Sequence, residues 1–148
     1  MNIPKYLSGV RCLFLDTAPV IYYVEAHPLY LPKVEKIFEL IDTGLLTAVT
    51  SPITLSECLI LPYRLESEEL EQKFSALIIG GSNTIFMPID DSIAKQAAKL
   101  RARYNLSLAD ALQIAVALAA GCDAFLTNDI ALKRVQELNI LVIDEIPV

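Results

Sequence analysis

The sequence predicts an α/β fold, with a central parallel sheet of about five strands flanked by helices on both faces. Short apolar segments of strand length alternate along the chain with longer segments whose apolar residues recur at helical spacing. The short segments are apolar throughout, a composition typical of parallel strands that are covered on both faces. We expect one domain over residues 1–148, because the sequence contains no internal repeat, low-complexity run or linker.

Five segments are predicted to form the strands of this sheet: residues 12–15, 45–49, 84–87, 124–127 and 140–143. The first helix follows the first strand over residues 20–24, and Pro19 suits its first turn. The second helix begins at Pro32 and ends at Gly44, since proline is favoured in the first turn of a helix and glycine just after its end.

The next four helices begin where a small polar or acidic residue stands directly before a helical pattern. These candidate N-cap residues are Ser51, Ser67, Asp90 or Asp91, and Ser107. The helices that they open are predicted to end near Pro62, Gly80, Arg103 and Gly121. A short last helix is predicted over residues 130–138.

The composition, with 54% apolar and 20% charged residues, indicates a globular protein. No apolar run approaches the roughly 20 residues that a bilayer span requires. Arg11 and Asp16 interrupt the apolar stretch that a signal peptide would need, so we expect the protein in the cytoplasm. Cys12, Cys58 and Cys122 are widely spaced, and we interpret them as reduced, mostly buried thiols.

The net charge of −6 argues against a protein that binds nucleic acid through charge alone, because such affinity comes from Lys and Arg contacts to phosphate. An enzyme whose bound metal ions supply positive charge is compatible with an acidic sequence. No arrangement of serine, cysteine or histidine suited to nucleophilic catalysis is visible, and we interpret His27 as an exposed loop residue. An enzyme of this composition would therefore depend on its acidic residues and on a bound metal ion.

Four carboxylates, Asp16, Glu57, Asp110 and Asp129, are predicted to meet at one edge of the sheet. Asp16 and Asp129 lie just past the first and fourth strands, and ligands of open parallel sheets bind outside such strand ends. Glu57 and Asp110 lie in the early turns of strongly apolar helices, where an unpaired carboxylate is costly to desolvate. Four such groups repel one another, and a hard divalent cation, Mg²⁺ or Mn²⁺, relieves that repulsion.

Three of these acids also have a purely structural interpretation. Asp16 could be the N-cap of the helix that follows it. Asp110 stands three residues after Ser107, which is the spacing of a capping box. Asp129 follows Asn128 in a pair typical of turns and caps. The metal site is therefore argued from the set of four acids and not from any single member.

In order and spacing, four short motifs resemble those of the PIN-domain family, above all its small prokaryotic VapC-like toxins. The motifs are residues 14–17 (FLDT), 51–57 (SPITLSE), 108–115 (LADALQIA) and 126–129 (LTND), and the match covers nearly the whole chain. The resemblance implies a PIN-like endoribonuclease that uses Mg²⁺ or Mn²⁺ to cleave single-stranded RNA, leaving 5′-phosphate and 3′-hydroxyl ends. It further implies the toxin of a type II toxin–antitoxin pair, a homodimer, and a cognate antitoxin that blocks the cleft.

The resemblance also implies roles for individual residues. The catalytic and metal-binding set of the family matches Asp16, Glu57, Asp110 and Asp129. Thr17 matches the small hydroxyl residue beside the first aspartate, and Thr127 and Asn128 match polar positions that orient ligands or position water. Many relatives place a further acid and an aromatic residue after the last aspartate, whereas this sequence continues IALK.

Contacts to RNA phosphates require basic side chains. Lys133 and Arg134 are candidates because they closely follow the last acid, and Arg64 is a further candidate. The apolar helices over residues 29–41 and 53–65, if exposed, would suit a protein partner or a second copy of the chain.

Three other functions are compatible with parts of this pattern. A phosphatase of the haloacid dehalogenase type expects a second aspartate two residues after the first, and this position is Ala18. A receiver-type phosphoacceptor domain has no need for Glu57 and Asp110 in apolar helices. The third alternative is a catalytically silent PIN-like module that binds RNA or a protein, which a metal-dependent cleavage assay would distinguish from an enzyme.

Overall fold

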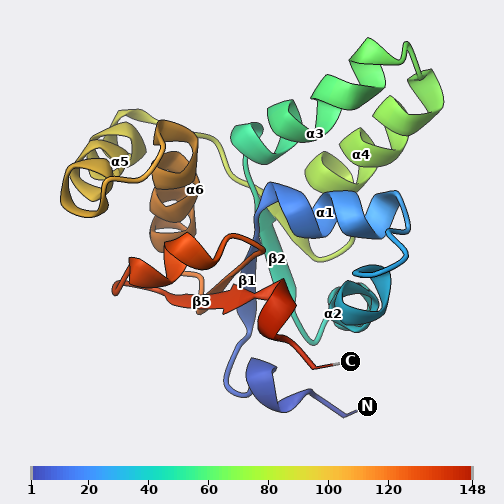
Figure 1. Ribbon diagram of the computed structural model, residues 1–148, viewed down its shortest axis with the longest axis horizontal. Helices are drawn as coiled ribbons and strands as arrows, with labels where there is room; N and C mark the ends of the chain where they lie inside the picture. Colours follow the sequence, from blue (N-terminus) through green and yellow to red (C-terminus); the bar gives the residue numbers. More distant parts are fainter. Residues whose placement is uncertain (1, 148) are drawn as a thin grey trace.

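The computed structural model describes residues 2–147, which form a parallel five-stranded sheet with helices on both faces (Figure 1). The strands are β1 (Cys12–Leu15), β2 (Thr47–Thr50), β3 (Thr84–Phe86), β4 (Ala124–Thr127) and β5 (Asn139–Val142). Their order in the sheet is β3-β2-β1-β4-β5, and every neighbouring pair is parallel. The predicted α/β class is confirmed.

The helices connect consecutive strands, as expected for a parallel sheet. The α-helices are α1 (Thr17–Val24), α2 (Leu31–Thr43), α3 (Pro52–Arg64), α4 (Glu68–Gly80), α5 (Asp91–Tyr104) and α6 (Leu108–Ala119). The 3₁₀ helices are η1 (Lys5–Leu7), η2 (Ile130–Arg134) and η3 (Ile143–Glu145). The predicted helix over residues 130–138 is wrong in length and type. Its buried residues Leu132, Val135 and Leu138 recur every three positions, which fits a 3₁₀ turn followed by extended chain.

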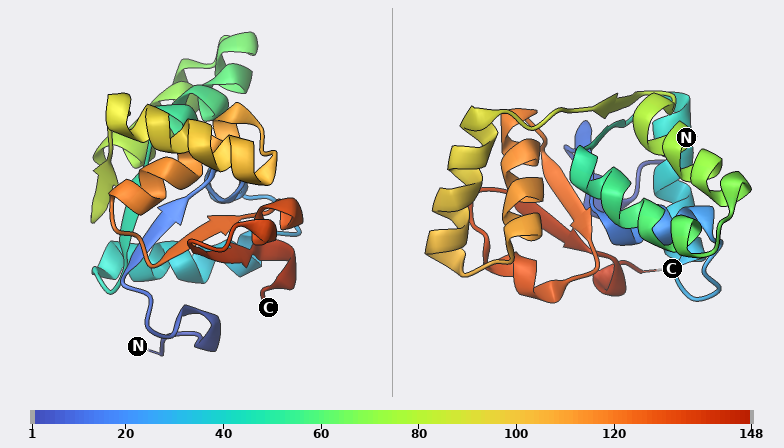
Figure 2. Two further views of the ribbon diagram at one scale, coloured as in Figure 1. Left: turned by 90° about the vertical axis from the view of Figure 1, so that its left-hand side faces the viewer. Right: turned by 90° about the horizontal axis from the view of Figure 1, so that it is seen from above.

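Alternate residues of β1, β2, β4 and β5 contribute to two separate cores, one on each face of the sheet (Figure 2). Leu13 and Leu15 pack with α1, α2, α3 and α4, whereas Phe14 packs with α5, α6 and η2. Phe14 stacks on Phe125 of the neighbouring strand at 4.9 Å between ring centroids. Burial on both faces explains why these strands are apolar throughout.

The helix boundaries follow the predicted capping residues closely. The side chains of the predicted N-caps accept backbone hydrogen bonds from the first turn of their helices, and these residues are Ser51, Ser67, Asp90 and Ser107. Gly44 ends α2 with a left-handed backbone, φ 86°. The predicted end of α3 at Pro62 is wrong, because the helix continues through this buried proline to Arg64.

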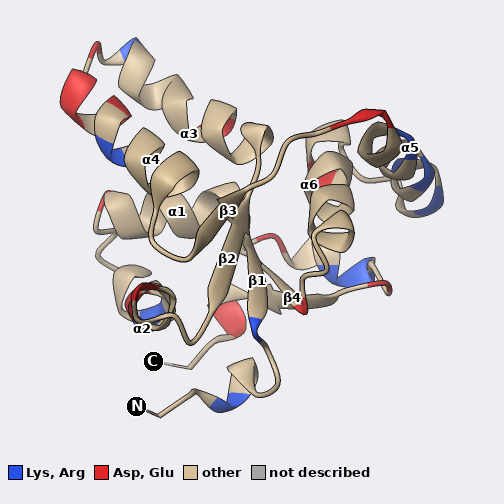
Figure 3. Ribbon diagram, turned by 180° about the vertical axis from the view of Figure 1, so that it is seen from behind, with Lys and Arg blue, Asp and Glu red and all other residues tan. Residues whose placement is uncertain are grey.

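Helices α3 and α4 pack against each other and extend beyond the sheet as an arm (Figures 1 and 2). The apolar residues that α3 exposes are Ile60, Leu61, Tyr63 and the C-cap Leu65. Acidic residues gather at the far end of the arm, while Lys and Arg gather on α5 (Figure 3). The expectation of an exposed apolar face on α2 is wrong, because Val34, Ile37 and Phe38 are buried in the core.

All three cysteines are free thiols, Cys58 and Cys122 buried and Cys12 half-buried. The sulfur atoms of Cys12 and Cys122 lie 3.3 Å apart, a proximity that their spacing in the sequence did not indicate. Burial raises the pKa of Cys58 to about 12 and also raises the pKa of Cys122, which keeps these thiols protonated. Among the helices of residues 2–147, none has both the length and the apolar character of a membrane span.

Candidate metal centre

The candidate site lies where the strand order of the sheet reverses direction. From β1 the chain builds the sheet to one side through β2 and β3, and to the other through β4 and β5. Asp16 directly follows β1, and Asp129 lies two residues beyond β4. Since β1 and β4 pair in parallel, the prediction that these two acids follow neighbouring strands is confirmed.

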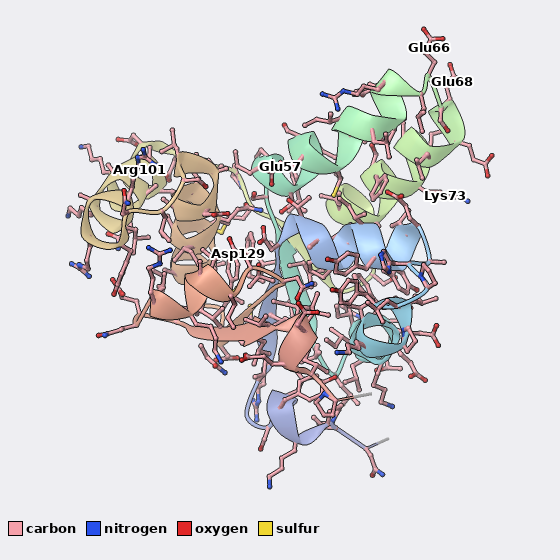
Figure 4. All side chains as sticks on the ribbon, in the orientation of Figure 1. Glu57, Glu66, Glu68, Lys73, Arg101 and Asp129 are labelled. Atoms are coloured by element: carbon pink, nitrogen blue, oxygen red, sulfur yellow. The ribbon has the colours of Figure 1, made fainter. Side chains whose placement is uncertain are left out.

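A surface pocket of about 490 Å³ at this edge is lined by residues from several separate segments. Its lining contains all four predicted acids, Asp16, Glu57, Asp110 and Asp129, together with Thr17, Ala18, Ile21, Tyr22, Ile60, Thr127 and Asn128. Figure 4 labels Glu57 near the base of α3 and Asp129 in the loop that leads into η2. Within residues 2–147, no Lys or Arg lines this pocket, so its charged lining is entirely acidic.

Asp16 is the most buried of the four acids, with 8% of its surface exposed. It occupies the N-cap position of α1, but its side chain makes no capping hydrogen bond. Instead, Thr127 Oγ1 donates a hydrogen bond to Asp16 Oδ2 at 2.8 Å. Burial raises the pKa of Asp16 to about 6, and the charges of Asp110 and Glu57 contribute to the rise. The N-cap interpretation therefore does not account for this carboxylate.

Glu57 is exposed at the mouth of the pocket, where Thr17 Oγ1 donates a hydrogen bond to its Oε1 at 2.5 Å. The expectation of a desolvated carboxylate is wrong here. Helix α3 buries one face, through residues such as Thr54 and Cys58, and Glu57 lies at the edge of that face, on the side open to solvent. Its position on the pocket, and not the cost of burying it, is what connects Glu57 with the other acids.

Asp110 and Asp129 combine a capping role with a place on the pocket. The backbone N–H of Asp110 bonds Ser107 Oγ at 3.1 Å, which is one half of the predicted capping box. Burial raises the pKa of the Asp110 carboxyl, and the charges of Asp129 and Glu57 raise it further. Asp129 is exposed and caps η2, since its Oδ1 accepts from the N–H of Ala131 at 3.0 Å.

Asn128 ties the loop after β4 to two other segments. Its Nδ2 donates to Tyr22 Oη at 3.1 Å, and its Oδ1 accepts from the N–H of Asp144 at 2.9 Å. Tyr22 is a pocket residue that sequence reasoning missed, and only its place in the helix after Asp16 could have indicated it. The aromatic ring of Tyr22 stacks on Tyr30 with 4.3 Å between ring centroids.

His27 is half-buried and is not the exposed loop residue that we expected. Its Nδ1 accepts hydrogen bonds from the N–H groups of Leu29 and Tyr30 at 3.1 and 3.3 Å. Its ring packs edge-on against Tyr22, at 5.1 Å between centroids. These contacts make His27 an organiser of the turn between α1 and α2, because its imidazole satisfies two backbone donors there.

Sequence reasoning also missed a buried polar cluster between α3 and α6, formed by Ser51, Thr54 and Gln113. Each of these side chains is at most 1% exposed. Gln113 hydrogen-bonds to Ser51 through its Oε1 and to Thr54 Oγ1 through its Nε2. The available signal was the single polar residue that interrupts an otherwise apolar stretch, Gln113.

The predicted phosphate-binding residues lie outside the pocket lining. Lys133 Nζ is paired with Glu145 at 2.6 Å. Arg134 bonds the carbonyl oxygens of Ala131 and Tyr104, which fixes it as a link between η2 and α5. Arg64 ends α3, seven residues after Glu57 and therefore roughly 10 Å further along the helix axis.

The four acids fit a hard divalent cation by their chemistry, since each offers oxygen atoms. Burial is the main reason that the pKa values of Asp16 and Asp110 are raised, and the charges of the neighbouring acids add to the rise. A divalent cation offsets this repulsion between carboxylates. Within the described part of the chain, no three His, Cys, Asp or Glu side chains lie close enough together to share one ion. Holding an ion at this pocket therefore requires the acidic side chains to turn toward one another.

Comparison with known proteins supports the same assignment of the fold. Residues 13–138 match the family model of the PIN domain. Comparison with curated proteins gave no match. Among solved structures, the chain is similar to VapBC2 from Rickettsia felis bound to a DNA fragment from its promoter. The TM-score is 0.68 at 23% identity, over 88% of this chain and 98% of the other.

Two further solved structures have the same architecture. FitAcB from Neisseria gonorrhoeae is similar at a TM-score of 0.69 and 19% identity, over 90% of this chain and 99% of the other. The second is VapC20 of Mycobacterium tuberculosis, a toxin that cleaves the sarcin–ricin loop. Its TM-score is 0.63 at 17% identity, over 76% of this chain and 86% of the other. At these identities the similarity establishes the fold.

Proposed function

Because this chain belongs to the PIN-domain family, we propose that it is an endoribonuclease that hydrolyses single-stranded RNA with Mg²⁺ or Mn²⁺. PIN-domain proteins are nucleases, and a hydrolase of phosphodiester bonds is what this membership supports. The observation that carries the proposal is the acidic pocket. Four carboxylates from four separate segments line it, at the edge of the sheet where ligands of such folds bind.

In this proposal Asp16, Glu57, Asp110 and Asp129 hold the ion. When bound, a divalent ion lowers the pKa of a water molecule and neutralises negative charge on the phosphate. Thr127 orients Asp16 through its hydrogen bond to Oδ2. Thr17 holds Glu57 by its hydrogen bond to Oε1.

The rest of the pocket suits a nucleotide. Its lining contains the apolar residues Ile21 and Ile60 and the aromatic ring of Tyr22, which offer contact surface to a base or sugar. Because no Lys or Arg of residues 2–147 lines the pocket, its acids would repel a phosphate unless a cation neutralised them. RNA binding and metal binding are therefore coupled in this proposal.

We further propose a cognate antitoxin as partner and a homodimer as the assembly, with the protein acting in the cytoplasm as the toxin of the pair. The similar structures include a toxin–antitoxin complex from Klebsiella pneumoniae and VapBC from Salmonella typhimurium bound to DNA. The exposed apolar residues of α3, such as Leu61, Tyr63 and Leu65, are available for such contacts.

A cleavage assay tests the proposal. We expect the purified protein to cut a single-stranded RNA in millimolar Mn²⁺ or Mg²⁺ and to lose this activity in EDTA. Asp16→Asn and Asp110→Asn should each reduce cleavage by roughly 100-fold or more with the circular dichroism spectrum unchanged, since each removes a charged ligand. The matched control is Asp91→Asn, the same change in an exposed acid of α5 outside the pocket.

Two results would contradict the proposal. A variant of either pocket acid that cuts RNA as well as the wild type would overturn the site assignment. Binding of RNA without cleavage in every metal, unaffected by EDTA, would instead support the catalytically silent PIN-like module.

A further inference from the structure

We infer that Gln113 is a positioning residue that, through Ser51 and Thr54, sets the spacing between the helices that carry Glu57 and Asp110. The inference rests on the proposed metal site, because it concerns how two of its acids are held. We refer to Ser51, Thr54 and Gln113 together as the clamp.

The clamp joins three segments through a single side-chain amide. Gln113 accepts a hydrogen bond from Ser51 Oγ and donates one to Thr54 Oγ1 at 2.7 Å. Thr54 Oγ1 in turn donates to the carbonyl oxygen of Leu15 at 3.2 Å, one residue before Asp16. Ser51 Oγ also caps α3 by accepting from the N–H of Ile53 at 3.0 Å. A change at Gln113 thus affects the end of β1, the start of α3 and α6 together.

The register of the clamp places it one helical turn from the acids. Thr54 precedes Glu57 by three residues on α3, and Gln113 follows Asp110 by three residues on α6. Residues three apart lie on the same face of a helix. The Gln113–Thr54 hydrogen bond therefore joins the two helices within about one turn of Glu57 and of Asp110, where it sets the spacing between the helices.

Glutamine is the chemically specific choice at this position. The amide presents an acceptor to Ser51 and a donor to Thr54 at the same time, which neither an ionised Glu nor Met can do. Among the described residues, no buried side-chain nitrogen or oxygen lacks a hydrogen-bond partner, so the clamp is fully satisfied. A satisfied buried network has one favoured geometry, and this rigidity is what a metal site requires of the residues behind its ligands.

A purely structural role for Gln113 makes a different prediction from a positioning role. If Gln113 only stabilises the core, its replacement lowers the melting temperature and leaves metal affinity unchanged at temperatures where the protein is folded. If Gln113 positions the acids, its replacement also weakens metal binding. The loss of metal affinity is then larger than in a variant that loses similar stability at a buried site outside the clamp. The two roles are separated by measuring both quantities on the same variants.

The experiment compares three variants by titrating free Mn²⁺ with electron paramagnetic resonance, at a temperature where all are folded. Gln113→Met keeps the volume and removes both hydrogen bonds, and Thr54→Val removes the bonds to Gln113 and Leu15. Thr50→Val is the matched control. Thr50 precedes Ser51 in the chain and is 1% exposed, but its hydroxyl bonds the carbonyl oxygen of Ile78 at 2.7 Å and not a residue of the clamp.

We expect Gln113→Met to weaken Mn²⁺ binding about tenfold and Thr54→Val to weaken it about threefold or more. Thr50→Val should change the Mn²⁺ dissociation constant by less than about twofold. It should nevertheless lower the melting temperature about as much as the two clamp variants do. If Gln113→Met does not fold, the comparison of the Mn²⁺ dissociation constants of Thr54→Val and Thr50→Val decides the question.

Equal Mn²⁺ affinities for the clamp variants and the control would overturn the inference and leave the proposed function standing. A wild-type protein that binds no Mn²⁺ would overturn the proposed metal site, and the clamp inference with it. The wild-type titration distinguishes these two outcomes, because Mn²⁺ binding by the wild-type protein leaves the proposed metal site in place.

Discussion

Asp16 is a buried acid whose charge the fold itself opposes. Its carboxyl lies against the core at the end of β1, and burial raises its pKa from 3.8 to about 6. The folded protein therefore favours the neutral carboxyl more than the unfolded chain does. The resulting stabilisation is complete below pH 3.8 and is lost as the pH rises through about 6. At pH 8 the ionised side chain reduces the free energy of unfolding by roughly 3 kcal/mol.

Asp16→Asn should accordingly stabilise the protein in the absence of metal, in a manner that depends on pH. The amide keeps an oxygen that can accept from Thr127 but carries no charge. In EDTA we expect the free energy of unfolding in urea to rise by roughly 1–3 kcal/mol at pH 8 and to change little at pH 4. Equal gains at the two pH values would show that the effect is not the desolvated charge of Asp16.

At the level of residues, the sequence predicted which acids line the pocket but not how each is held. Apolar neighbours suggested that Glu57 is desolvated, yet burial in a helix is decided by the face that packs. Cys58 is buried and Glu57, one residue earlier, is exposed. The clamp was invisible to local patterns, because Gln113 bonds side chains that stand 62 and 59 residues earlier.

At the level of elements, local signals predicted most boundaries. Strands β1 and β4 have the predicted limits, since buried apolar runs flanked by polar residues identify them. The errors occur where tertiary contacts override a local preference. Pro62 is tolerated inside α3 because it is buried between the helices of the arm, although proline usually ends a helix. The segment Ile130–Arg134 forms a 3₁₀ turn that lies against β5 and buries Leu132, where the sequence pattern predicted a longer helix.

The end of α2 provides a test of capping by a left-handed residue. Gly44 has φ +86°, and a Cβ added there would lie 3.4 Å from Asn83 Nδ2, which itself bonds the carbonyl oxygen of Ile41. We expect Gly44→Ala to lower the free energy of unfolding by about 1 kcal/mol, measured in urea.

The matched control for this substitution is Gly80→Ala at the end of α4. Gly80 has no left-handed backbone, and a Cβ added there would meet nothing within 4 Å. This variant should be roughly 0.5–1 kcal/mol more stable than the wild type, because alanine favours the helix and restricts the unfolded chain. If Gly80→Ala lowered the free energy of unfolding as much as Gly44→Ala, the left-handed backbone at Gly44 would be ruled out as the cause of its destabilisation.

At the level of the whole molecule, the fold assembles one acidic pocket from residues as far apart in sequence as Asp16 and Asp129. The net charge is −6, Lys and Arg gather on α5 (Figure 3), and within residues 2–147 none of them lines the pocket. In the proposed function, general charge attraction to RNA is therefore weak, and the affinity for RNA would rest on bound cations and on contacts with bases. The net charge of the sequence indicated that a nuclease of this kind would depend on bound metal ions, and the acidic lining of the pocket agrees with that expectation.

Metal binding should stabilise the whole molecule, because the four acids line one pocket only in the folded state. We expect Mn²⁺ at a hundredfold excess over its dissociation constant to add about 2.7 kcal/mol, raising the melting temperature by about 5–10 °C at pH 8. The shift should fade toward pH 5, since protons compete with the ion once the pH falls below the pKa of Asp16, about 6. Asp16→Asn should remove most of it, whereas Asp91→Asn should keep it. A shift that persists in Asp16→Asn would place the ion elsewhere, because no other acid of the pocket lies as deep in the cleft.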